Sequence, residues 1–264
     1  MPPLETLPEL TAPTWALLGT GALIVGLSKT ALPGAATVSV GLFALALPAK
    51  ESTAALLLLL LVGDAMALWI YRGDPDVVTL LRLIPSVLAG IVLGAAFFVL
   101  VEGATVQRVI GIVLLGLVVV ALWQRRTRAA HDAGGEVPDD ALGARQPSRA
   151  VGAGYGALGG FTTMVANAGG PVMSLYFLSM RMPVATFLGT AAWFFALINL
   201  IKLPFSLGLG LVTARTLTMD LVLVPLVLLG GVCGAVIAQR IPQRLFDGIV
   251  LGLTALSALA LIVR

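Results

Sequence analysis

The sequence predicts an all-α polytopic membrane protein made of two inverted repeats, each with a short re-entrant or broken helical hairpin and three spanning helices. Hydrophobic residues make up 59% of the chain and charged residues 11%, compared with about 25% charged residues in a soluble domain. Apolar segments follow one another along the chain, and the second half weakly repeats the first. This composition cannot cover a water-exposed surface, so a soluble domain is disfavoured.

Ten apolar segments differ in length. Six have about the length that a spanning helix needs: 52–71, 77–100, 106–124, 183–201, 216–238 and 245–263. Four shorter ones form two pairs, 15–27 with 35–47 and 150–165 with 171–180. A Gly- or Pro-containing tip separates the members of each pair, which is the pattern that points to a transporter binding site. We expect the two tips, 28–34 and 165–170, to meet near the bilayer midplane.

An internal duplication accounts for the two pairs. At an offset of 135 residues Gly34 aligns with Gly169 and Asp64 with Asn199. At an offset of 140 three further pairs align: Pro85 with Pro225, Gly90 with Gly230, and Gly94 with Gly234. The predicted division is a first membrane repeat over 1–124, a linker loop over 125–149 and a second membrane repeat over 150–264. Each half has an odd number of full spans plus one hairpin, so the halves are expected to lie inverted in the membrane.

The linker loop sets the expected orientation. It carries five arginines and four acids, and loops rich in Lys and Arg stay on the cytoplasmic side. The net charge of +3 therefore reflects membrane orientation and does not predict a nucleic-acid partner. We expect a multi-pass protein of the cell membrane with a cytoplasmic central loop. Small-residue helix faces such as Gly90–Gly94 are compatible with a homodimer.

Lys29 lies at the first tip, within "GLSKTALPGAATVS", and its nearest acids in sequence are Glu9 and Glu51. An ionisable side chain deep in a bilayer costs about 2.5–3.5 kcal/mol and indicates a function. An anionic substrate would supply the missing counter-charge. The alternative is that Lys29 lies in a surface loop and extends its ammonium group to water.

Two helix starts point at the same place. Helices predicted to begin after Pro33–Gly34 and at Gly169–Gly170 would direct free N–H groups and positive dipole ends to the tips, as in anion sites. Hydrogen-bonding side chains flank both tips: Ser28, Thr30, Thr163 and Asn167. The alternative is that the glycines only allow close helix packing.

Three polar residues interrupt long apolar segments. Asp64 is expected to face the interior, where it would pair with Lys29 or Lys202, carry a coupling proton, or make a structural interhelical hydrogen bond. Asn199 is either structural or a ligand contact. Lys202 either borders the pocket or caps a helix end. The sequence contains no H-E-x-x-H, P-loop or G-x-S-x-G motif, so we expect no catalytic site, no metal and no cofactor.

Residues 26–74, beginning "GLSKTALPGAATVS", resemble the first-half signature of the sulfite exporter TauE/SafE family, also called the 4-toluene sulfonate uptake permease family. Residues 167–208, beginning "NAGGPVMSLYFLSM", are similar to its second-half signature. The resemblance implies a bacterial inner-membrane carrier of sulfur-containing oxyanions such as sulfite, sulfoacetate, other organosulfonates or thiosulfate.

The expected function is export of sulfite or an organosulfonate by alternating access, with possible proton coupling. Lys29 would neutralise the anion, and the amides of Gly34, Gly169 and Gly170 would bind its oxygens. Further side chains would complete the shell or balance the charge: Ser28, Thr30, Thr163, Asn167, Asn199, Asp64 and Lys202. The alternatives are a carrier of organic carboxylates, an anion channel, or a membrane sensor that binds without transporting.

Overall fold

The computed structural model describes residues 10–73, 75–100, 148–208 and 210–242, together with five isolated positions (119, 245, 248, 249 and 252). Every regular element in this part of the chain is helical. The elements are α1 (Ala12–Thr30), a 3-10 turn η2 (Pro33–Ala35), α2 (Ala36–Ala46), α3 (Ala49–Tyr71), α4 (Val77–Leu100), α6 (Arg149–Ala166), α7 (Gly169–Ser179), α8 (Val184–Gly208) and α9 (Ala214–Ala238). This confirms the all-α class. The predicted spans 106–124 and 245–263, and nearly all of the linker loop, lie outside the described residues.

Among the described residues, four helices, α3, α4, α8 and α9, are long and apolar enough to cross a membrane. They contain 23 to 25 residues, or roughly 35–38 Å at 1.5 Å per residue, which exceeds a hydrocarbon core of about 30 Å. Large apolar side chains on their outer faces are exposed, Trp69 by 75% and Leu81 by 64%. Such a surface fits lipid and would be a liability in water. The chain is therefore an integral membrane protein.

The first helix of each hairpin is longer than the sequence predicts. Their second limbs, α2 and α7, have 11 residues each, but the first limbs, α1 and α6, have 19 and 18. The expected segment 15–27 ended before the polar run Ser28–Thr30, whereas α1 continues through it. A prediction from hydropathy ends the helix at its first charged residue. A buried lysine that pairs with an acid can nevertheless lie within a helix, as Lys29 does with Asp64. The expected first tip is accordingly confined to the break at Ala31–Leu32 and the turn η2.

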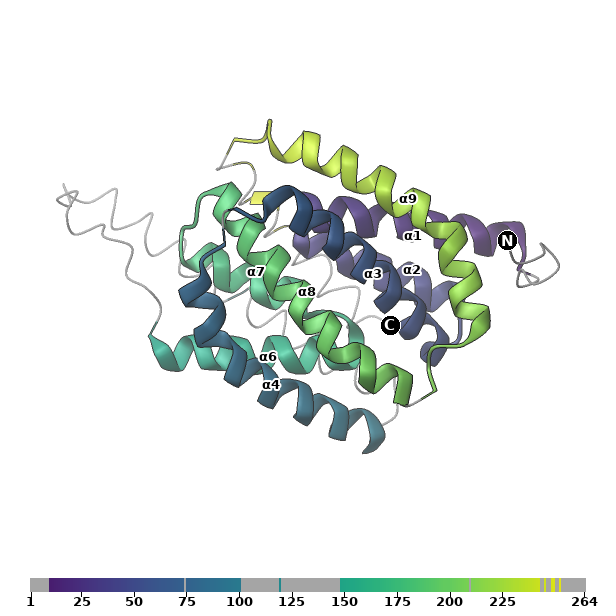
Figure 1. Cartoon of the computed structure of the whole chain (residues 1–264), viewed down its shortest axis with the longest axis horizontal. Helices are drawn as coiled ribbons and strands as arrows, with labels where there is room; N and C mark the ends of the chain where they lie inside the picture. The colour runs from purple at the N-terminus through teal and green to yellow at the C-terminus, as the bar shows by residue number, and fades with distance from the viewer. Residues whose placement is uncertain are drawn as a thin grey trace.

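Close backbone contacts join α1 to α9 along one edge of the bundle (Figure 1). A Cβ atom at Gly26 would overlap the carbonyl oxygen of Val227, and a Cβ atom at Gly230 would overlap that of Leu23. Both positions therefore require glycine for this helix spacing.

The same contact recurs between α4 and α6 along the opposite edge (Figure 1). Here a Cβ atom at Gly160 would overlap the carbonyl oxygen of Val87, and one at Gly90 would overlap that of Ala157. These four residues are offset by 134 or 140 positions from their counterparts between α1 and α9. A duplicated chain predicts this recurrence. The inversion of the halves in the membrane and the repeat boundaries remain predictions.

Candidate anion-binding site

The centre of the bundle lies between α3 and α8, which cross between the two edges (Figure 1). Lys29, in the last turn of α1, reaches this centre and forms an ion pair with Asp64 of α3, with 2.6 Å between Nζ and Oδ1. Both residues are buried. The membrane-surface alternative for Lys29 does not fit a side chain enclosed in this way. Of the two basic partners expected for Asp64, the structure brings Lys29 into contact.

Asn199 of α8 completes the surroundings of Asp64. Its Nδ2 donates a hydrogen bond to Asp64 Oδ2 over 2.6 Å. Each oxygen of the carboxylate therefore has a partner, one from α1 and one from α8. This arrangement fixes the carboxylate and links both halves of the chain.

Lys202 has different surroundings. Its Nζ donates to Asn167 Oδ1 and lies 3.5 Å from both Thr163 Oγ1 and Asn199 Oδ1. All three acceptors are neutral, and no carboxylate of the described residues lies within ion-pair distance. The side chain is 2% exposed and lies well inside α8, which continues to Gly208. Lys202 is thus a buried basic residue that contacts no acidic side chain in the described part of the chain.

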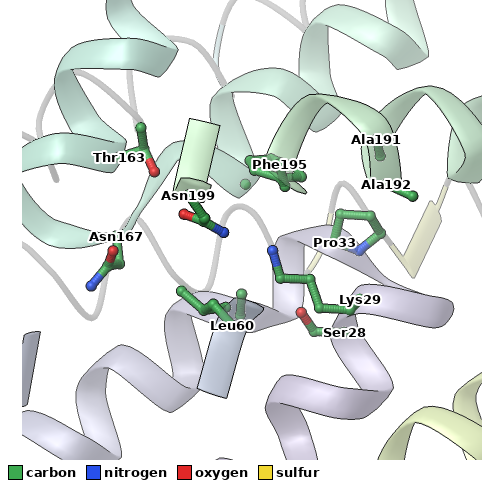
Figure 2. A pocket seen from close by; sticks show the side chains of 12 residues that line it. Ser28, Lys29, Pro33, Leu60, Thr163, Asn167, Ala191, Ala192, Phe195 and Asn199 are labelled. Atoms are coloured by element: carbon green, nitrogen blue, oxygen red, sulfur yellow. The ribbon is translucent and has the colours of Figure 1, made fainter. Parts of the chain in front are cut away.

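A small cavity of about 20 Å³ lies beside the ion pair. Figure 2 shows Lys29 and Asn199 extending into it, with Thr163 and Asn167 on the opposite side from Lys29. The lining residues are Ser28, Lys29, Pro33, Ala36, Leu60, Thr163, Asn167, Gly170, Ala191, Ala192, Phe195 and Asn199. This volume holds about one water molecule, so an oxyanion enters only if side chains or helices move. This conformation therefore leaves no room for an oxyanion at the site.

A second cavity, of about 10 Å³, lies on the other side of Asn167. Lys202, Ser206 and Leu211 contribute to its lining. Asn167 lines both cavities, and its Nδ2 donates to the carbonyl oxygen of Thr53 over 3.3 Å. Asn167 is therefore the wall between the two spaces, held by α3 on one side and by Lys202 on the other.

The two tips touch each other. A Cβ atom at Gly170 would lie 2.5 Å from the carbonyl oxygen of Pro33. The second tip turns at Asn167, which has φ 51° and ψ 25° and ends α6, and α7 begins at Gly169. Gly170 thus allows the start of α7 to approach the first tip, and both tips contribute to the cavity wall.

Two predicted site residues, Thr30 and Gly169, make packing contacts outside the cavity, and Gly34 lies where the sequence predicts. Thr30 donates its hydroxyl hydrogen to Gly231 of α9 over 2.8 Å, on the α9 side of α1. A Cβ atom at Gly169 would meet Thr163 Cβ at 2.8 Å, so Gly169 serves the packing of α7 on α6. Gly34 lies in the turn η2 at the first tip.

Ser28 stands out among the lining residues. Its side chain is fully buried, and its hydroxyl has no hydrogen-bond partner within the described part of the chain. A buried hydroxyl without a partner is unfavourable. Ser28 is therefore available to hydrogen-bond a ligand in the cavity that it lines.

Sequence reasoning missed two apolar contributors, Leu60 and Phe195. The Nζ of Lys29 lies 4.7 Å from the centre of the Phe195 ring, within the range of a cation–π interaction. Leu60 precedes Asp64 by one helical turn, and Phe195 precedes Asn199 by one turn. Because residues four apart share a helix face, the i−4 positions of the two polar residues would have indicated them.

A larger cavity, of about 460 Å³, lies between α4 and α8. Its lining is almost entirely apolar, and rim residues such as Val77, Leu81 and Leu200 are largely exposed. It offers no charged group for an anion. In the part of the chain described here, no cluster of His, Cys, Asp and Glu could hold a metal ion.

The family model described as Sulfite exporter TauE/SafE matches residues 18–261. The chain belongs to the sulfite exporter TauE/SafE family. The match spans both tips, both α3 and α8, and nearly the whole chain, and it confirms the resemblance seen in the two signatures. Membership identifies a membrane transporter of the class that moves sulfite and related sulfur anions. The chain matches no curated protein and no solved structure.

Proposed function

We propose that this TauE/SafE protein is a secondary transporter that exports sulfite, or an organosulfonate such as sulfoacetate, across the bacterial inner membrane. The observation that carries the proposal is Lys202, a buried cation whose contacts are neutral, beside a cavity formed where the two tips meet. A buried charge without a counter-ion is strongly unfavourable. A bound anion would supply that counter-ion.

The residues around the cavity take distinct roles. Lys202 attracts the anion, while Lys29, already paired with Asp64, places an N–H donor at the cavity wall. Ser28 and Thr163 offer hydroxyl groups, and the start of α7 at Gly170 offers backbone N–H groups. Hydrogen bonds from charged donors to oxyanions are about twice as strong as neutral ones. The ion pair supports a charge-balancing role for Asp64.

Alternating access accounts for the small volume of the site. The two cavities, of about 20 and 10 Å³, are separated by Asn167, as expected for a conformation closed to both sides. An anion channel would need a continuous wide path. We therefore favour a carrier in which α3 and α8 move relative to each other to open one side at a time.

Counterflow in proteoliposomes tests the proposal. Vesicles preloaded with unlabelled sulfite should accumulate labelled sulfite transiently, since a carrier exchanges substrates while a channel only equilibrates them. Lys202→Gln should lower the rate by about tenfold or more, because the site then lacks its unpaired charge. The matched control is Arg215→Gln, which removes a half-exposed arginine paired with Glu51 and should leave the rate unchanged.

Competition by a panel of anions separates the remaining alternative, a carrier of organic carboxylates. Sulfite and alkanesulfonates should inhibit counterflow, and acetate and succinate should not. Inhibition by carboxylates alone would contradict the proposed substrate class. Absence of any counterflow, with anion binding intact, would favour a sensor.

A further inference from the structure

The charges at the centre of the bundle can be counted. Lys29 and Lys202 each contribute one positive charge and Asp64 contributes one negative charge, and all three are buried. Another buried acid, Asp220, lies on α9 eleven residues before Gly231, which contacts Thr30 beside the site. Neither carboxylate oxygen of Asp220 has a hydrogen-bond partner among the described residues, so no contact joins it to the cluster. With these three side chains ionised, this cluster of described residues carries one net positive charge.

The positive charge of Lys29 is balanced by Asp64. Its Nζ lies 2.6 Å from Asp64 Oδ1, and Asn199 holds the other oxygen of the same carboxylate. The pair is therefore neutral as a unit, and Asp64 has no freedom to turn away from Lys29. An entering anion meets a hydrogen-bond donor at Lys29 whose charge is already balanced.

Lys202 supplies the unbalanced charge. Its contacts are with the amide oxygens of Asn167 and Asn199 and the hydroxyl of Thr163, and all three of these residues also line the cavity beside Lys29. An anion in that cavity is thus one residue layer from an uncompensated ammonium group. Electrostatic interactions are strong at such depth because the surroundings have a low dielectric constant.

We propose that this site binds singly charged anions in preference to doubly charged anions of the same shape, and that Asp64 sets this selectivity. One negative charge makes the occupied cluster neutral. Two negative charges would leave one buried and uncompensated, which is unfavourable in a low-dielectric interior. This inference rests on the proposed function and narrows its substrates. Among the proposed substrates it selects hydrogen sulfite, the singly charged form of sulfite, and singly charged alkanesulfonates over sulfoacetate, which carries two charges at neutral pH.

A pair of probes with matched shape tests the selectivity. Methanesulfonate and methylphosphonate each carry a methyl group and three oxygens on a tetrahedral centre, and they are compared at a pH where the phosphonate carries two charges. Calorimetric titration of the purified full chain in nanodiscs gives the two dissociation constants. We expect wild-type protein to bind methanesulfonate at least about tenfold more tightly.

Two variants assign the selectivity to Asp64. Asp64→Asn raises the cluster charge to two and should reduce the preference for methanesulfonate by about tenfold or reverse it. The double variant Lys29→Met/Asp64→Asn returns the cluster to one positive charge and should restore the wild-type preference. Because both variants lack the carboxylate, this comparison separates charge from the loss of Asp64 hydrogen bonds.

The outcomes are distinguishable. Equal affinities in wild-type protein, or tighter binding of the doubly charged probe, overturn the inference even where sulfite counterflow persists, and the proposed function then stands. Binding of neither probe also overturns the inference, and absent counterflow in addition overturns the proposed function. If the variants do not fold, the wild-type comparison still decides whether the selectivity exists.

Discussion

Asn199 and Asp64, 135 positions apart in the sequence, are joined by a hydrogen bond of 2.6 Å from Asn199 Nδ2 to Asp64 Oδ2. The bond connects α8 to α3 at the centre of the bundle, and Lys29 of α1 pairs with the second oxygen of Asp64. Three helices thus converge on one carboxylate. The ion pair is part of the fold before any anion binds, which separates the roles of the two central lysines.

Removal of one member of the ion pair should destabilise the protein. Lys29→Met leaves Asp64 buried without its counter-charge and should lower the free energy of unfolding by about 3–5 kcal/mol. The double variant Lys29→Met/Asp64→Asn removes both charges and should recover most of this loss. Unfolding in mixed micelles with increasing sodium dodecyl sulfate measures both. A single variant as stable as wild type would contradict the structural role of the pair.

The backbone at Asn167 can be tested separately from its side chain. Asn167 has a left-handed conformation, φ 51°, which glycine adopts freely and alanine adopts at a cost of roughly 1–2 kcal/mol. Asn167→Gly and Asn167→Ala both remove the side-chain contacts with Lys202 and Thr53. The alanine variant should therefore be less stable than the glycine variant by about that amount in the same unfolding titration. Equal stabilities would show that the turn relaxes.

The sequence predicted the helices of the fold better than it predicted which side chains pair with one another. Long apolar segments revealed α3, α4, α8 and α9, and the repeat aligned Asp64 with Asn199. The choice between Lys29 and Lys202 as the partner of Asp64 depends on how α1 and α8 are placed around α3. No local pattern encodes that placement, since the residues lie far apart in sequence.

The positions of the helix ends were the second feature that the sequence did not predict well. Hydropathy placed the end of the first limb before Ser28, but the ion pair allows α1 to include Lys29 and Thr30. That extra turn directs Thr30 toward Gly231 of α9 rather than into the cavity. The additional turn therefore gives Thr30, which the sequence analysis assigned to the binding site, a contact with α9 instead.

The glycine contacts at the two edges of the bundle predict equal effects of equivalent substitutions. Gly90→Ala and Gly230→Ala would each overlap a carbonyl oxygen of the neighbouring helix and should each cost about 1–3 kcal/mol through overpacking. The matched control is Gly41→Ala on α2, where a Cβ atom would meet nothing within 4 Å. This change should be neutral or stabilising by about 0.5–1 kcal/mol, because alanine favours the helix. A large loss at one edge alone would argue that the contacts are not equivalent.

Ser28 and Thr30 allow ligand binding and structure to be separated within one turn of α1. Ser28→Ala removes a buried hydroxyl that has no hydrogen-bond partner among the described residues. The variant should be at least as stable as wild type, and it should bind methanesulfonate roughly 2- to 13-fold more weakly through the loss of one hydrogen bond worth about 0.5–1.5 kcal/mol. Thr30→Val instead removes the hydroxyl that donates to Gly231. It should lower the free energy of unfolding by about 1–3 kcal/mol, because the carbonyl oxygen loses a partner, and leave the affinity of the folded fraction unchanged. Calorimetric titration and detergent unfolding of both variants provide the four values. A Ser28→Ala variant that loses stability but retains its affinity would place the hydroxyl in the fold and remove it from the site.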